Sequence, residues 1–321
     1  MGRVSRRALV LTVLLLANAA GCSGEGGEEG TMERAQGGND IRRPVVAGAF
    51  YTGDREALAA EVDRYIAAAE PVAVEGTPVA LIAPHAGYVY SGGVAGHAYA
   101  AVRGRAYDTV IVVAPSHRVP FRGASVFDGD GYGTPLGVVP VDRQLAGAIA
   151  EGVGEYRRID QAHSQEHSLE VQVPFLQRAL GDFSIVPIVM GDQGEAAARR
   201  LAGRIANAVR DARDKRVLLV ASTDLSHYHD YETAVELDSR VVELVSEFDP
   251  EGALAALAAG RCEACGGGPA AAVMMAARDL GADRARVLNY ANSGDVTGDR
   301  GQVVGYMAAV VTRSSGRAGE G

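Results

Sequence analysis

Residues 79–85 read Val-Ala-Leu-Ile-Ala-Pro-His, a short apolar run that ends in a histidine. Residues 109–117 repeat this arrangement as Thr-Val-Ile-Val-Val-Ala-Pro-Ser-His, and residues 217–227 do so as Val-Leu-Leu-Val-Ala-Ser-Thr-Asp-Leu-Ser-His. Runs this short and this apolar are typical of strands that are covered on both faces. Three predicted strands therefore each deliver a histidine just beyond their carboxyl end: His85, His117 and His227.

Apolar runs alternate with helical patterns along most of the chain. The pattern predicts one α/β domain over residues 42–312, with a mostly parallel central sheet flanked by helices. The predicted strands are Val79–Ala83, Thr109–Ala114, Phe183–Met190, Arg216–Ala221, Arg286–Asn292 and Val303–Val311. The predicted helices are Arg55–Ala69, Gly92–Val102, Arg143–Ile149, Leu169–Leu180, Glu195–Arg213, Tyr231–Glu247, Pro250–Ala259 and Pro269–Leu280. Ligands bind at the carboxyl ends of parallel strands, so the three histidines are expected to share a transition-metal site.

The charge balance argues against several functions. The chain has 31 Lys+Arg and 40 Asp+Glu, for a net charge of −9, whereas a nucleic-acid-binding protein needs a basic face. Lys215 is the only lysine. Schiff-base chemistry and a P-loop both need a placed lysine, so neither is expected.

The first residues are typical of a targeting segment. Arginines precede a thirteen-residue apolar stretch, Ala8–Ala20, which is too short to span a bilayer. We predict a lipoprotein-type signal peptide over residues 1–21 with lipidation at Cys22, the alternative being a plain cleaved signal. Residues 22–41, rich in Gly and Glu, are expected to be a flexible tether, and residues 313–321 a disordered tail. The predicted location is the cell envelope, with the protein anchored to the membrane through Cys22.

Two cysteines lie together in Arg-Cys-Glu-Ala-Cys-Gly-Gly-Gly-Pro. Cys265 directly precedes a predicted helix, whose dipole favours a thiolate, so it could be a metal ligand or a nucleophile. The alternative is a disulfide with Cys262, which an exported protein permits. Asp224, three residues before His227, could orient that histidine ring.

Further polar side chains are weaker candidates. His167 and Glu170 share a helical face, so they could form a metal pair, an acid–base pair or a helix-start network. His163 and Glu166, in the same segment, are expected to be solvated. Residues 292–295 end a predicted strand. Their small polar groups, Asn292, Ser293 and Asp295, could line a pocket or serve the turn alone.

Seven stretches of the chain resemble the Memo family, the bacterial branch of which is called AmmeMemoRadiSam system protein B. They occur in the family's order and cover about residues 42–312. The stretches are residues 43–51 (Arg-Pro-Val-Val-Ala-Gly-Ala-Phe-Tyr), 83–88 (Ala-Pro-His-Ala-Gly-Tyr), 114–117 (Ala-Pro-Ser-His), 166–170 (Glu-His-Ser-Leu-Glu), 222–227 (Ser-Thr-Asp-Leu-Ser-His), 265–266 (Cys-Gly) and 290–295 (Tyr-Ala-Asn-Ser-Gly-Asp).

The resemblance implies a fold similar to class III extradiol dioxygenases, the non-haem iron enzymes that open catechol rings. It implies His85, His117 and Cys265 as metal ligands, with Asp224 and His227 beside the metal. His227 would stand where the dioxygenases place their acid–base histidine. Those enzymes have a carboxylate in place of the cysteine, and a thiolate with imidazoles suits one copper or iron ion.

We therefore expect a Memo-like, redox-active metal-binding protein. One alternative is a metal-dependent oxidoreductase on a small molecule, with Asp224 and His227 as catalytic residues and Tyr88, His167, Glu170 and the 292–295 turn around the pocket. Another alternative is a peptide- or protein-binding module on a former enzyme scaffold. The family label also implies a functional link to radical-SAM and AMMECR-type proteins.

Overall fold

A computed structural model describes residues 40–69, 74–151 and 156–314. The predicted signal peptide, the predicted lipidation site at Cys22 and nearly all of the predicted tether and tail lie outside these ranges and remain predictions. Within the described ranges, no helix has both the length and the apolar character needed to cross a membrane.

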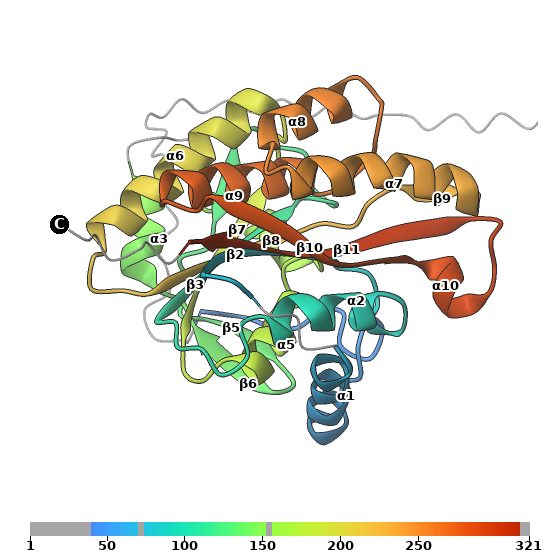
Figure 1. Cartoon of the computed structure of the whole chain (residues 1–321). Helices are drawn as coiled ribbons and strands as arrows, with labels where there is room; N and C mark the ends of the chain where they lie inside the picture. The colour runs from blue at the N-terminus through green and yellow to red at the C-terminus, as the bar shows by residue number, and fades with distance from the viewer. Residues whose placement is uncertain (1–39, 70–73, 152–155, 315–321) are drawn as a thin grey trace, which may run out of the picture. The chain divides into compact units, whose positions relative to one another are not determined.

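An eight-stranded sheet forms the centre of the domain (Figure 1). Its strand order is β10-β11-β2-β8-β3-β7-β4, and β9 pairs with β11. Four neighbouring strands are mutually parallel: β2 (Thr77–Ala83), β8 (Val217–Ser222), β3 (Thr109–Pro115) and β7 (Ser184–Met190). The outer strands join through antiparallel pairs: β4 (Ala124–Val126), β9 (His227–His229), β10 (Arg284–Asn292) and β11 (Val303–Arg313). The mostly parallel sheet is therefore confirmed at its centre, and it is mixed at both sides.

All six predicted strands are present. The structure also contains five short strands that the sequence analysis did not predict. β4 and β9 are two of them. The others form a separate small sheet: β1 (Ile41–Arg42), β5 (Gly131–Thr134) and β6 (Gly137–Pro140). Each of the five has only two to four residues, so none contains an apolar run long enough to be recognised.

Helices cover both faces of the sheet (Figure 1). The eight predicted helices are confirmed: α1 (Arg55–Ala68), α2 (Tyr88–Ala100), α3 (Arg143–Ala150), α5 (Gln172–Ala179), α6 (Glu195–Asp211), α7 (Tyr231–Ser246), α8 (Pro250–Ala258) and α9 (Gly267–Asp279). Two five-residue helices, α4 (Asp160–Ser164) and α10 (Ser293–Thr297), were missed. Helices α6 to α9 lie on one side, and α1, α2 and α5 lie on the other.

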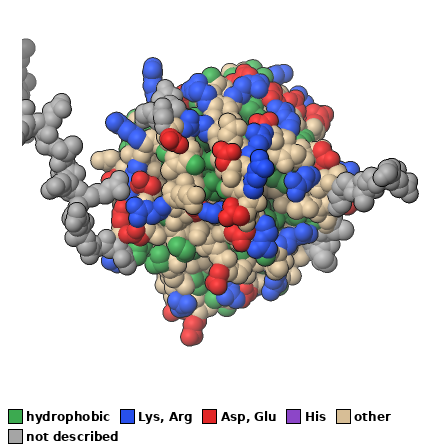
Figure 2. Space-filling model, turned by 90° about the vertical axis from the view of Figure 1, so that its left-hand side faces the viewer, with side chains coloured by type: hydrophobic (Ala, Val, Ile, Leu, Met, Phe, Trp, Pro, Cys, Tyr) green, Lys and Arg blue, Asp and Glu red, His purple; other side chains and the backbone are tan. Residues whose placement is uncertain are grey.

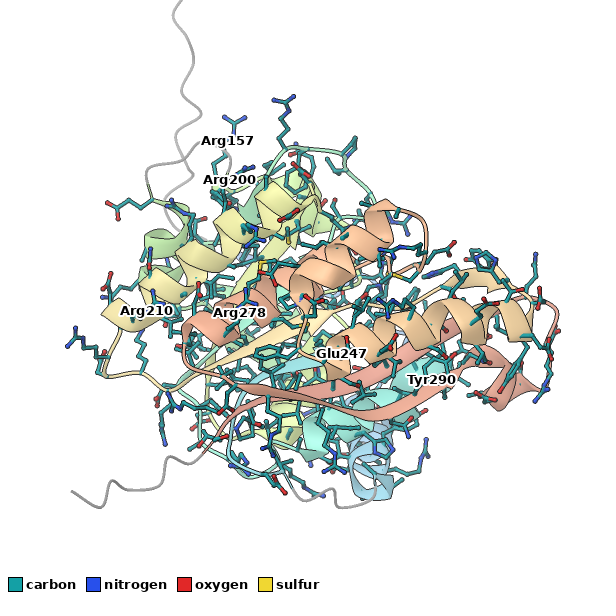
Figure 3. All side chains as sticks on the ribbon, turned by 45° about the horizontal axis from the view of Figure 1, so that its top comes forward. Arg157, Arg200, Arg210, Glu247, Arg278 and Tyr290 are labelled. Carbon is teal, nitrogen blue, oxygen red and sulfur yellow. The ribbon has the colours of Figure 1, made fainter. Side chains whose placement is uncertain are left out.

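The most buried helix is α9, which carries the cysteine segment at its start. Its alanine-rich sequence lets it pack directly on the strands, since small side chains allow a close approach. Polar contacts hold its far end. Arg210 of α6 donates to the carbonyl of Asp279 at 2.8 Å, and Arg278 pairs with Glu251 of α8. Figure 3 labels the two arginines. The start of α9 is therefore attached to a firmly packed element.

A buried carboxylate attaches the first described residues to the domain. Glu170 is fully buried and accepts hydrogen bonds from the Arg42 guanidinium and from the Tyr51 hydroxyl, the latter at 2.5 Å. It also accepts from the backbone N–H groups of Val45 at 2.9 Å and Val46 at 3.1 Å. Of the three roles considered for Glu170, the structure therefore shows a hydrogen-bond network that holds residues 42–51.

We expect Glu170→Ala to lower the free energy of unfolding by about 3–5 kcal/mol, because it leaves the Arg42 charge buried without a counter-charge. The measurement is urea unfolding of the full chain. The matched control is Glu195→Ala, which removes an exposed carboxylate paired with Arg199 at 2.9 Å and should cost less than about 1 kcal/mol. Equal losses in the two variants would contradict this assignment.

Candidate metal centre

The structure brings together the three side chains named as metal ligands. His85 Nε2 lies 3.1 Å from the Sγ atom of Cys265, although the two residues are 180 positions apart. The rings of His85 and His117 are 5.1 Å apart between centroids. One ligand atom from each of the three lies within 4.8 Å of the others. We call this set the His-His-Cys group.

The ring of His85 is held in one tautomer by Ser222, the last residue of β8. The Ser222 hydroxyl donates its single hydrogen to the carbonyl of Ser168 at 2.6 Å. It must therefore accept at its 2.9 Å contact with His85 Nδ1, so that nitrogen carries the hydrogen. This leaves the lone pair of Nε2 directed at the thiol. Burial also lowers the pKa of His85 well below its ordinary value, so the ring stays neutral.

The ring of His117 is held in the same tautomer by Glu166. A Glu166 oxygen lies 3.0 Å from His117 Nδ1, and the other accepts from the His117 backbone N–H at 2.6 Å. Burial by itself would raise the pKa of Glu166, but the hydrogen bonds from His117 and Ser168 hold it at about 2. An ionised carboxylate only accepts, so Nδ1 carries the hydrogen and Nε2 is again free.

Cys265 is placed by backbone contacts at the start of α9. Its N–H donates to the carbonyl of Asp224 at 3.2 Å, and its own carbonyl accepts from the Gln193 side chain at 2.8 Å. The next residue must be glycine, since a Cβ at Gly266 would lie 2.2 Å from the carbonyl oxygen of Ser222.

The surroundings of Cys265 do not favour the thiolate expected from the helix dipole. Burial raises the pKa of Cys265, and the nearby Asp224 carboxyl raises it further. Cys262 is buried. In the structure Cys262 and Cys265 are both free thiols, so they do not form the disulfide that was the alternative.

Asp224 and His227 flank the His-His-Cys group. Asp224 is almost fully buried, and its Oδ1 accepts from the backbone N–H of His85 at 2.7 Å. Burial raises the pKa of Asp224 to about 7. His227 Nδ1 lies 2.8 Å from the carbonyl of Leu225, which can only accept, so its Nε2 lone pair is also free. Burial lowers the pKa of His227.

Glu166 and His163 were expected to be solvated, and this prediction was wrong. Glu166 is fully buried and His163 is 1% exposed, with its Nε2 at 3.0 Å from the Ser125 hydroxyl. The sequence carried a signal for Glu166 only in the stretch 166–170 that resembles the Memo family. Spacing along a helix could not show that its carboxylate contacts His117.

His167 forms a second possible metal-holding set with His117 and Glu166. Its ring lies 4.7 Å from that of His117 and 5.6 Å from that of His85 between centroids. Burial lowers the pKa of His167 to about 4. The Glu166 oxygens already accept three hydrogen bonds, so we assign Glu166 to orienting the rings and His167 to the wall of the site.

The remaining predicted pocket residues make hydrogen bonds within the fold, although the buried Nδ2 of Asn292 has no hydrogen-bond partner among the described residues. Tyr88 is buried, and its hydroxyl donates to the carbonyl of Val171 at 2.6 Å. Asn292 and Asp295 form a capping box at the start of α10. Ser293 Oγ accepts from the N–H of Val304 at 3.0 Å. In the 292–295 segment, the structure thus shows hydrogen bonds that serve the turn, which was the alternative to lining a pocket.

We expect Glu166→Gln to weaken metal binding by about 10–100-fold, because the His117 ring loses an anionic acceptor at Nδ1. The measurement is competition with a chromophoric chelator. Glu263→Gln is the matched control. It alters an exposed carboxylate 3.0 Å from His229 Nε2, outside the His-His-Cys group, and should leave the affinity unchanged. Unchanged affinity in both variants would remove the orienting role of Glu166.

The burial of His163 predicts a loss of stability in acid. Burial lowers its folded-state pKa to about 3, from an ordinary value of 6.5. Below pH 6.5 the unfolded chain therefore binds more protons, and the free energy of unfolding falls as pH falls. Between pH 6.5 and pH 5, this one group should account for roughly 1.5 kcal/mol. Urea unfolding of His163→Gln should show a correspondingly weaker pH dependence, and an unchanged dependence would contradict the assignment.

Comparison with known proteins shows the family of this chain. The sequence model described as "Memo-like protein" matches residues 42–310. A MEMO1 family protein of Methanothermobacter thermautotrophicus is 40% identical over 277 residues, covering 83% of this chain and 98% of its own length. Relatives of the same description in Aeropyrum pernix (39%) and Thermotoga sp. (36%) each cover 84% of this chain and 99% of their own. The chain therefore belongs to the Memo family, as the resemblance predicted.

Proposed function

We propose that this protein binds one copper or iron ion through His85, His117 and Cys265, and that the bound ion serves a redox role. The observation that carries the proposal is the pair of fixed tautomers. Ser222 and Glu166 each occupy an Nδ1 atom, so both Nε2 lone pairs are free beside one thiol.

The donor set supports this choice of metals. Two neutral imidazoles and a thiolate form a mixed nitrogen and sulfur site, which suits copper and iron better than magnesium or calcium. The low pKa of His85 supports binding as well, because protons do not compete for its nitrogen at neutral pH. The thiol of Cys265 would lose its proton on binding, since a metal ion takes the thiolate.

A second candidate function is catalysis on a small molecule. A bound copper or iron ion would supply electron transfer and binding of a substrate oxygen. The observation that favours it is the pair of proton-carrying groups beside the ligands. Burial brings the pKa of Asp224 to about 7, so this carboxyl can gain or lose a proton near neutral pH. The free Nε2 of His227 is a second acceptor.

Elemental analysis of the full chain, purified under reducing conditions without oxygen, tests the proposal. We expect about one equivalent of copper or iron in the wild type. His85→Ala and Cys265→Ser should each lose it, because each removes a donor from a three-ligand group. His229→Ala changes a histidine that pairs with Glu263 outside the group, and it should retain the metal.

Two results would change the assignment. A wild type that stays metal-free after loading with Cu(I) or Fe(II) would overturn both metal functions and leave the peptide- or protein-binding module. Metal that is retained in His85→Ala and Cys265→Ser would place it elsewhere in the chain. Once loading is established, oxygen uptake in the wild type but not in His227→Gln would support catalysis.

A further inference from the structure

A pocket lies at the edge of the sheet opposite to the His-His-Cys group. It has a volume of about 490 Å³ and is lined where β2 and β8 begin and β11 ends, near Thr77, Val217 and Arg313. The metal-ligand histidines follow the other ends of the parallel strands, so the two sites are separate. Figure 2 views the molecule from the side on which the chain leaves β11. Basic and acidic side chains both stand on this side.

The lining of this pocket is strongly basic. It includes Arg105, Lys215, Arg216 and Arg313, with no Asp or Glu among the described lining residues. In a chain whose net charge is −9, such a concentration of positive charge is unusual. A small cavity whose lining carries several positive charges and no carboxylate is a favourable place for an anion.

Two of these four cations already have partners. Lys215 Nζ lies 2.5 Å from a carboxylate oxygen of Asp142, and Arg216 makes a two-point contact with Asp108 at 2.9 and 3.0 Å. The side chains of Arg105 and Arg313 form no hydrogen bond or ion pair with any residue in the described ranges. Both residues are exposed, so two guanidinium groups are available to a dianion.

The rest of the wall is mostly apolar. Val79, Val209 and Leu280 line it, and the one phenol, Tyr107, uses its hydroxyl to donate to the carbonyl of Pro78 at 3.0 Å. This wall offers contact area to carbon atoms and few hydrogen bonds to a polar body. The guanidinium fork binds phosphate oxygens in pairs, so arginine suits a phosphate group in particular.

We propose that this pocket binds a small phosphate monoester, with Arg105 and Arg313 contacting the phosphate and the apolar wall contacting the organic part. A purely structural role is the competing explanation, because cations near the ends of helices also stabilise helix dipoles. The structural role needs no ligand. A titration with a phosphate monoester therefore distinguishes the two explanations, because only the proposed site would bind it.

Calorimetric titration of the full chain with hexyl phosphate tests the proposal. We expect saturable binding at one site per chain. Hexanoate, which has one negative charge, should bind at least about 10-fold more weakly. The variant Arg105→Gln/Arg313→Gln should weaken hexyl phosphate binding by about 10-fold or more, since hydrogen bonds to charged groups are lost. Vesicles of phosphatidylcholine with and without phosphatidic acid distinguish a lipid headgroup from a free ester as the source of the phosphate.

The control is Arg122→Gln/Arg261→Gln, which removes the same charge from two exposed arginines that do not line the pocket. It should bind hexyl phosphate like the wild type. Thermal unfolding of both variants shows that each is folded. The proposal is overturned if neither hexyl phosphate nor phosphatidic acid vesicles bind, or if both double variants weaken binding equally. Lower thermal stability in Arg105→Gln/Arg313→Gln, with hexyl phosphate binding intact, would establish the structural role instead.

Discussion

One buried hydroxyl, that of Ser222, joins the parts of the candidate metal centre. It donates to the carbonyl of Ser168, lies against the ring of His85 and accepts from the amide of Gln172 at 2.8 Å. Gln172 in turn accepts from the Tyr99 hydroxyl at 2.6 Å and donates to the carbonyl of Pro84 at 2.9 Å. None of these groups is exposed to water. Each hydrogen bond therefore decides whether the next group in the chain donates or accepts. The tautomer of His85 follows from that chain of bonds.

Two carboxylates four residues apart have different roles, one in the metal centre and one in the fold. Glu166 accepts from His117 and orients its ring, while Glu170 accepts from Arg42 and Tyr51 and holds the first described residues on the domain. Both are fully buried and belong to the segment that leads into α5. The same segment thus supports both the fold and the site.

The sheet separates two chemical environments. At the carboxyl ends of its parallel strands, buried imidazoles, a thiol and Asp224 form a site suited to a soft or borderline metal ion. At the amino ends, arginines line a pocket with an apolar wall. The two sites are separated by the length of the strands. The arginines of the pocket therefore have little effect on the electrostatic potential at the metal centre, where a positive ion would bind. The two proposals can therefore be tested independently.

The sequence by itself determined the longer elements and the residue types of the metal centre. Long apolar runs and helical periods predicted six strands and eight helices, because those patterns follow from burial along a single element. The strand ends pointed to His85, His117 and His227, and the family resemblance added Cys265. Short strands such as β5 and β9 were missed, since two to four residues carry no measurable period.

Only the tertiary structure decided which atoms are available. Three contacts join segments that are far apart in the sequence. Glu166 is buried against His117, Ser222 leaves Nε2 of His85 free, and Glu170 holds Arg42. Burial also reversed the expectation of a thiolate at Cys265, because desolvation outweighs the field of one helix end. Hydrogen bonds and desolvation depend on what surrounds a side chain in space, whereas strand and helix patterns depend on what neighbours it along the chain.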